Sequence, residues 1–202
     1  MKLARPRGRP RAYDPEKALG DIRDVFWRHG YSATSLDDLS AATGMNRPSL
    51  YGAFGAKEDL YLKALDRYRA EGVAAMMAAL DPKLSLREGL ARVYETALSM
   101  YLPDKGAARG CLLIGTAAVE AMSDEKVRRV LGDSLRDFDQ EFEKRFRAAR
   151  KSGEIARDSD PVLLAKFASA VLHTLALRSR AGDARKELEK TAKAGIEMLC
   201  GK

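Results

Sequence analysis

Residues 34–57, T-S-L-D-D-L-S-A-A-T-G-M-N-R-P-S-L-Y-G-A-F-G-A-K, decide the fold that we predict for this chain. Ser35 and Asp38 have the spacing of a capping box, in which each side chain bonds the backbone amide of the other residue at a helix start. Gly44 then interrupts the apolar periodicity, at a position where helices commonly end in a left-handed residue. Asn46 is a favourable cap for a second helix. The pattern predicts two short helices joined by a tight turn.

Two helices in this order are typical of a helix-turn-helix, whose second helix enters the major groove of DNA and reads bases with its N-terminal residues. Leu50 and Phe54 lie four residues apart and are expected to face inward. Gly52 and Ala53 remove side-chain bulk, which would let a DNA backbone or phosphate approach closely. An ordinary helical hairpin inside a core would satisfy the same spacing.

A longer stretch carries more information, F-W-R-H-G-Y-S-A-T-S-L-D-D-L-S-A-A-T-G-M-N-R-P-S-L-Y-G-A-F-G-A-K-E-D-L, at residues 26–60. It resembles the DNA-binding domain of the TetR/AcrR (tetracycline-repressor) family of bacterial transcriptional regulators, and the similarity extends from residue 13 to about residue 68. Several motif elements in register argue against an ordinary hairpin. The resemblance implies an all-α fold, with an N-terminal three-helix helix-turn-helix domain and a C-terminal helical domain that binds a ligand and dimerises.

The residues of the second helix suggest roles in DNA binding. Arg47 has the geometry to bond guanine O6 and N7 together, Ser49 can bond a base edge or a phosphate, and Pro48 can contact a thymine methyl group. The resemblance implies that Tyr51 and Lys57 contact phosphates, with Thr34 or Ser35 beside them. The full set of expected DNA contacts is Thr34, Ser35, Asn46, Arg47, Pro48, Ser49, Tyr51, Gly52, Lys57, Arg7 and Arg9.

Asp37 departs from the resembled family, which often has a basic residue at this position. A carboxylate in the first turn of a helix is stabilised by the positive end of the helix dipole, and we favour this explanation. The alternative is that Asp37 accepts a hydrogen bond from cytosine N4.

Residues 1–11, M-K-L-A-R-P-R-G-R-P-R, contain five basic residues and no acidic one. Pro and Gly interrupt any helix and there is almost nothing to bury, so a disordered arm is expected over residues 1–13. Arg7 and Arg9 are the expected minor-groove contacts, because arginines favour narrow A·T-rich grooves. The alternative is a basic tail that only solubilises the protein. The net charge of +7 favours a polyanionic partner without distinguishing DNA from lipid.

We predict that the chain has three parts. These are an arm at 1–13, a DNA-binding domain at 14–73 with its reading motif at about 35–54, and an effector-binding and dimerisation domain at 74–202. The resemblance implies a homodimer formed by the last two helices, at about 161–180 and 184–199. A single monomer core would also account for their apolar faces.

The resemblance further implies a small-molecule effector enclosed by the second domain. Helix-lined apolar cavities with a few polar groups suit such ligands. Residues 111–122 are expected to form a mostly buried helix there. The candidate lining residues, each of which would also serve as ordinary core, are Tyr94, Tyr101, Cys111, Met122, Phe138, Phe142 and His173.

The sequence contains no G-x-x-x-x-G-K-S/T phosphate loop, no G-x-S-x-G or H-E-x-x-H motif and no paired-cysteine zinc spacing. An enzyme, a cofactor and a metal site are therefore not expected. Cys111 and Cys200 lie far apart in the sequence and do not have a C-x-x-C spacing. They are therefore expected to be reduced thiols in a cytosolic protein. The basic start lacks the apolar core of a signal peptide, and the most apolar helix, near 161–177, is short for a bilayer span. We expect a cytoplasmic protein with no membrane partner.

These observations favour a homodimeric repressor that binds a palindromic operator and leaves it when an effector binds. The alternative is an architectural nucleoid-binding protein that uses the same helix-turn-helix and basic arm without an effector. A third hypothesis is a helical binding module or enzyme whose hairpin only resembles a DNA reader.

Overall fold

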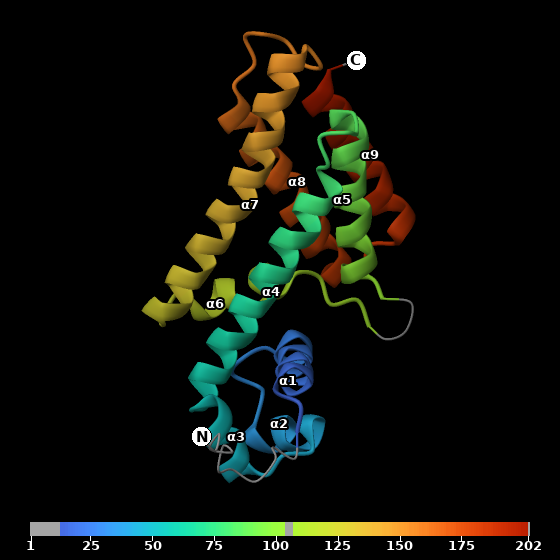
Figure 1. The fold of residues 1–202 in the computed structure, drawn as a ribbon. Helices are drawn as coiled ribbons and strands as arrows, with labels where there is room; N and C mark the ends of the chain where they lie inside the picture. Colours follow the sequence, from blue (N-terminus) through green and yellow to red (C-terminus); the bar gives the residue numbers. More distant parts are fainter. Residues whose placement is uncertain (1–12, 104–106, 202) are drawn as a thin grey trace, which may run out of the picture.

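The computed structural model describes residues 13–103 and 107–201 (Figure 1). Within these ranges every regular element is a helix, which confirms the predicted all-α fold. In chain order the elements are α1 (Pro15–His29), α2 (Leu36–Thr43), α3 (Arg47–Phe54), α4 (Lys57–Ala79), α5 (Leu86–Tyr101), the π-helix η1 (Leu113–Ala117), α6 (Ala118–Glu120), α7 (Glu125–Ser152), α8 (Pro161–Ala181) and α9 (Arg185–Cys200).

Polar caps determine where α2 and α3 begin. The Ser35 hydroxyl accepts the Asp38 N–H at 3.1 Å, and the Asp38 carboxylate accepts the Ser35 N–H at 2.8 Å, so the predicted capping box is present. The Asn46 side chain accepts the Ser49 N–H at 2.9 Å at the start of α3. Gly44, between the two helices, has φ 68°, a left-handed conformation that glycine adopts without steric cost.

Helices α1, α2 and α3 pack into a small body at one end of the molecule (Figure 1). Its interior contains completely buried side chains from each helix, namely Ile22, Phe26, Leu39 and Leu50. Tyr61 of α4 joins this core, with its ring 5.0 Å from that of Phe26. The side chains of three neighbouring helices thus determine the position of α3.

Helix α4 starts beside α3 and continues into a second body, a bundle with α5, α7, α8 and α9 (Figure 1). The helix is continuous from Lys57 to Ala79, so the boundary expected at residue 73 falls inside it. The division of the chain into domains at that residue stays a prediction. The bundle has its own apolar core, which includes Leu90, Tyr94, Phe142, Phe146 and Leu175.

The region at residues 111–122 differs from the buried helix that the sequence predicted. It consists of the π-helical turn η1 followed by the very short α6, which ends at Glu120. Val119 is 65% exposed and Met122 is 82% exposed. A π-helical turn contains more residues than an α-helical turn. The residues that follow η1 therefore do not continue the buried face that α-helical spacing predicts. The first part of this region is largely buried, and in its last part only Ala121 is.

One described helix, α8, meets the length and composition criteria for a membrane span. It packs along α7, α9 and α5 in the bundle. Ala168, Leu172 and Leu175 are buried in these contacts. Core helices of globular bundles have the same composition, because a helix covered on several sides is apolar around much of its circumference.

Candidate nucleic-acid interface and effector cavity

Helix α3 has one buried face and one exposed face. Leu50 is completely buried and Phe54 is 7% exposed, with its ring 6.2 Å from that of Tyr13. Tyr51 is 47% exposed, a large value for an aromatic side chain on a packed helix. The other exposed residues of this face are Asn46, Arg47, Pro48, Ser49, Gly52 and Ala53. The residues expected to read DNA therefore lie together on an open surface.

Arg47 on this surface is paired with Asp37 of α2. Its Nε lies 2.9 Å from Oδ1 of Asp37, and its Nη2 lies 2.6 Å from Oδ2. The hydrogen bonds and the charge of the carboxylate raise the pKa of Arg47. Neither explanation of Asp37 drawn from the sequence included this contact, since the two residues are ten positions apart and meet only across the turn.

The expected phosphate contacts lie at the edges of the same surface, with one exception. Lys57 is the first residue of α4, and its Nζ lies 4.4 Å from the centroid of the Tyr31 ring. Ser35 is exposed, and its hydroxyl donates to Asp38 at 2.6 Å. Thr34 is only 2% exposed, and its hydroxyl donates to the Gly30 carbonyl at 2.6 Å. The expectation that Thr34 contacts phosphate is therefore wrong, because the fold buries and uses its hydroxyl. Arg7 and Arg9 lie outside the described residues.

A cavity lies between α4, α5, η1, α7 and α8, and the volume open to the centre of a water molecule is about 50 Å³. Tyr101, Cys111, Phe138 and His173 line it, as the sequence led us to expect. Tyr94 and Phe142 are buried elsewhere in the core, and the Tyr94 hydroxyl donates to the Ala168 carbonyl at 3.2 Å. The other lining residues are Tyr68, Gly72, Ala75, Met76, Val93, Thr96, Ala97, Met100, Leu113, Ile114, Leu135 and Leu172.

Met122 was wrongly expected at this cavity. It belongs to the turn that follows α6, where its side chain is exposed. Tyr68 is a lining residue that the sequence analysis missed, because its helix was assigned to the DNA-binding domain. A signal was present, since Tyr68, Gly72 and Met76 continue one face of α4 at helical spacing.

The polar groups of the cavity are neutral. Burial raises the pKa of Tyr68, Tyr101 and Cys111, so all three keep their protons. Burial also lowers the pKa of His173, against the opposing charge of Asp139. No Asp, Glu, Lys or Arg of the described chain lines the cavity. This environment suits an uncharged ligand, because an unpaired charge is costly to bury.

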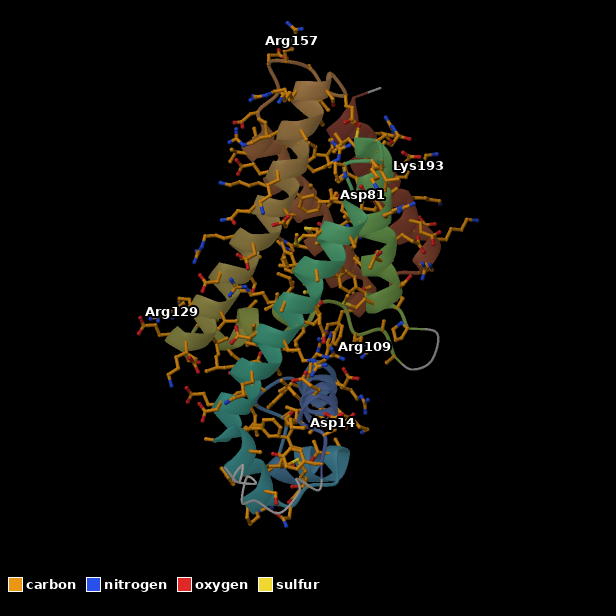
Figure 2. The ribbon with its side chains drawn as sticks, viewed as in Figure 1. Asp14, Asp81, Arg109, Arg129, Arg157 and Lys193 are labelled. Atoms are coloured by element: carbon orange, nitrogen blue, oxygen red, sulfur yellow. The ribbon has the colours of Figure 1, made fainter. Side chains whose placement is uncertain are left out.

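The wall of the cavity continues into a contact with α1. The Trp27 indole N–H donates to the Gly110 carbonyl at 2.9 Å, next to Cys111 in the chain. The Arg109 guanidinium lies 4.6 Å from the centroid of the Trp27 ring and 3.7 Å from Asp24. Figure 2 shows Arg109 where α1 meets the bundle. Gly110 has φ 60°, and a Cβ there would lie 2.5 Å from the Ala176 carbonyl oxygen. We call Trp27, Arg109 and Gly110 the junction.

A second hydrogen bond joins η1 to α4 close to the junction. Thr116 donates its hydroxyl proton to the Leu112 carbonyl at 2.7 Å, so Tyr61 is the donor in its 2.8 Å contact with Thr116. Burial raises the pKa of Tyr61 to about 12, which keeps this donor protonated. The segment that lines the cavity is thus bonded both to α1 and to the part of α4 that supports α3.

An exposed reading helix, set on a capped helix-turn-helix and attached to a helical bundle, defines a DNA-binding protein of the helix-turn-helix class. The family model "Bacterial regulatory proteins, tetR family" matches residues 20–64, and the model "Tetracyclin repressor-like, C-terminal domain" matches residues 88–194. The chain therefore belongs to the TetR family of bacterial regulators, which confirms the resemblance seen in the sequence.

Individual relatives agree with this assignment. The chain is 30% identical over 197 residues to the HTH-type transcriptional repressor ComR of Escherichia coli (strain K12), covering 97% of this chain and 93% of ComR. It is 29% identical to the HTH-type transcriptional regulator YezE of Bacillus subtilis (strain 168), covering 79% and 82% of the two chains. A cysteine mutant of the TetR-family regulator CifR, solved with a 26bp double-strand operator DNA, superposes with a TM-score of 0.85 at 33% identity, covering 94% and 98%. The protein is a DNA-binding transcriptional regulator and not an enzyme.

Proposed function

We propose that this protein is a homodimeric cytoplasmic repressor. Each subunit places α3 in the major groove of one half of a palindromic operator, and a small uncharged effector that enters the cavity releases the protein from DNA. The observation that carries the proposal is the exposed face of α3, on which Arg47, Ser49 and Tyr51 stand together on a rigid base.

The fold itself does not require a glycine at position 52 of this face. A Cβ added at Gly52 would meet no atom within 4 Å beyond its chain neighbours and the backbone of its own helix. The space beside Gly52 is therefore available to a partner, and a phosphate or sugar of the DNA backbone fits it. The likeness to CifR, which was solved on operator DNA, supports the same placement of α3. Arg47 is the proposed base reader, and Pro48 and Ser49 are proposed to contact neighbouring base edges.

Phosphates are proposed to bind around this face, to Tyr51, Lys57, Ser35 and Asn46. Lys57 is well placed for this role, because it stands at the N-terminus of α4, where the helix dipole and the free amides attract an anion. Arg7 and Arg9 are proposed to extend the contact into the adjacent minor groove.

Dimerisation through α8 and α9 is supported by apolar side chains that the isolated chain leaves in contact with water. Leu163, Phe167 and Leu177 of α8 are 51%, 56% and 55% exposed, and their spacing puts them on one helical face. Met198 of α9 is 85% exposed. A face of this kind marks an interaction site. In a two-fold dimer the same face serves both subunits, and the two α3 helices would lie about 34–36 Å apart or at a multiple of this distance.

Release by an effector is supported by the continuity between cavity and junction. Cys111 lines the cavity, and Gly110 beside it bonds Trp27 of α1. A ligand that displaces this segment would therefore also displace α1, and with it the body that carries α3. A small change at each junction would alter the separation of the two reading helices in a dimer.

Sequence selection from a library of random duplexes tests the proposal. The wild-type protein should select two inverted half-sites at a fixed spacing, and Arg47→Ala should lose the preference at one base pair of each half-site. A discrimination of about 5- to 150-fold at that pair is expected from a bidentate contact to guanine. Selection of A·T-rich duplexes without a fixed spacing would instead support the architectural alternative.

A further inference from the structure

We propose that Asp37 is a specificity-determining positioning residue, which holds the Arg47 guanidinium by one edge so that the adjacent edge is presented to guanine. The inference rests on the proposed function, since it takes Arg47 as a base reader. It assigns to Asp37 a role that neither helix-dipole stabilisation nor a direct contact to cytosine includes.

The donor atoms of Arg47 are sufficient for both partners at once. A guanidinium carries five N–H groups in a fixed planar arrangement. Asp37 accepts from Nε at 2.9 Å and from Nη2 at 2.6 Å, which occupies the Nε–Nη2 edge. Two protons on Nη1 and one on Nη2 remain. The Nη1–Nη2 edge has the spacing for a bidentate contact to O6 and N7 of guanine. The ion pair and the base contact are therefore compatible.

The environment of the pair indicates positioning and not stabilisation of the fold. The side chains of Arg47 and Asp37 are 56% and 73% exposed. Exposed ion pairs contribute little to folding stability. A free arginine on a helix surface samples many rotamers, which must be restricted when it binds a base. A bond that restricts the guanidinium before DNA arrives lowers this entropic cost, because the side chain is already ordered.

The neighbouring carboxylate has a different task. Asp38 accepts hydrogen bonds from the backbone amide and the hydroxyl of Ser35, at 2.8 Å and 2.6 Å, and so caps α2. Asp37 makes no contribution to this cap, and both of its oxygens face Arg47. The first turn of α2 thus contains two acidic residues, one that fixes the helix end and one that reaches across the turn to the reading helix.

Asp37 should also limit binding to unrelated DNA. An arginine free of its carboxylate can move to the nearest phosphate on any sequence, and its full charge adds to sequence-independent affinity. When Arg47 is paired with Asp37, the negative carboxylate offsets part of its positive charge, so the DNA phosphates attract it less. The carboxylate itself repels phosphate. Discrimination therefore depends on both an attractive contact to guanine and a repulsive one to other sites.

Library selection and equilibrium titration of Asp37→Ala test this inference. The guanine preference at the Arg47 base pair should fall about 1.4- to 5-fold, the range that exposed ion pairs contribute. Affinity for a random duplex should rise at the same time. Asp37→Asn, which keeps one acceptor oxygen, should lie between Asp37→Ala and wild type. Circular dichroism would show that the variants are folded at the assay temperature.

Asp38→Asn is the matched control, because it changes an adjacent carboxylate of the same helical turn. It should lower the unfolding temperature and leave the guanine preference unchanged. An unchanged or sharpened preference in Asp37→Ala would overturn the inference, and a sharpened one would mean that Asp37 withholds Arg47 from DNA. If Arg47→Ala itself retained the preference, the proposed function would lose its base reader, which is a separate failure.

Discussion

Trp27→Phe probes the contact between α1 and the wall of the cavity. Trp27 is 3% exposed, and its indole N–H donates to the Gly110 carbonyl at 2.9 Å. Phenylalanine retains an apolar ring against Tyr68 but removes the donor, so that the buried Gly110 carbonyl loses its side-chain partner. Leaving a buried acceptor unsatisfied costs about 1–3 kcal/mol. For a chain of this size a loss of about 2 kcal/mol lowers the thermal unfolding temperature by roughly 4–8 °C.

The junction predicts a second effect of Trp27→Phe, on DNA binding. The orientation of α1 on the bundle is less firmly fixed in this variant, so affinity for the selected operator should fall by at least about fivefold, the factor that corresponds to 1 kcal/mol. Fluorescence anisotropy of a labelled operator measures this affinity, and circular dichroism measures the unfolding temperature.

Tyr94→Phe provides the control for a general loss of stability. It removes a buried hydroxyl that donates to the Ala168 carbonyl at 3.2 Å within the bundle, away from the junction. This variant should lose stability and keep its operator affinity. If both variants bound operator equally well, the contact between Trp27 and Gly110 would have no part in linking the cavity to the DNA-binding surface.

Three further predictions concern other parts of the molecule. Lys57→Ala should weaken binding to all duplexes alike and reduce the slope of log affinity against log salt by about one unit. Titration at several salt concentrations measures both effects. A loss of affinity confined to one sequence would contradict a phosphate contact. Phe167→Asp should give monomers in sedimentation velocity, whereas Met122→Asp, at a more exposed apolar position outside α8 and α9, should stay dimeric. Burial lowers the pKa of His173 below 6.5, so the unfolded chain binds more protons and stability should fall as the pH drops from about 7 through 6.5 and below. His173→Gln should flatten this dependence of the unfolding free energy on pH.

The reading face could be predicted from the sequence because it depends on local rules. Caps form between residues two or three positions apart, so Ser35, Asp38 and Asn46 identify the helix starts without any knowledge of the rest of the fold. The spacing of Leu50 and Phe54 likewise identifies the buried side of α3. Each of these features lies within one turn of helix.

The features that the sequence did not predict depend on contacts between elements. Two adjacent hydroxyls, those of Thr34 and Ser35, look equivalent in the sequence, but the turn that joins α1 to α2 buries Thr34 and places its hydroxyl on the Gly30 carbonyl at the end of α1. The pairing of Arg47 with Asp37 requires the angle between α2 and α3. The exposure of Met122 follows from the end of α6, which no residue pattern indicated.

Dimethyl sulfate footprinting on a selected operator is the most direct test of the central claim, that α3 binds in the major groove. The reagent methylates guanine N7, which lies in the major groove, and adenine N3, which lies in the minor groove. The structure predicts protection of guanine N7 at symmetric positions in the two half-sites, and loss of this protection in Arg47→Ala. Protection of adenine N3 alone, with every guanine N7 still reactive, would contradict the placement of α3.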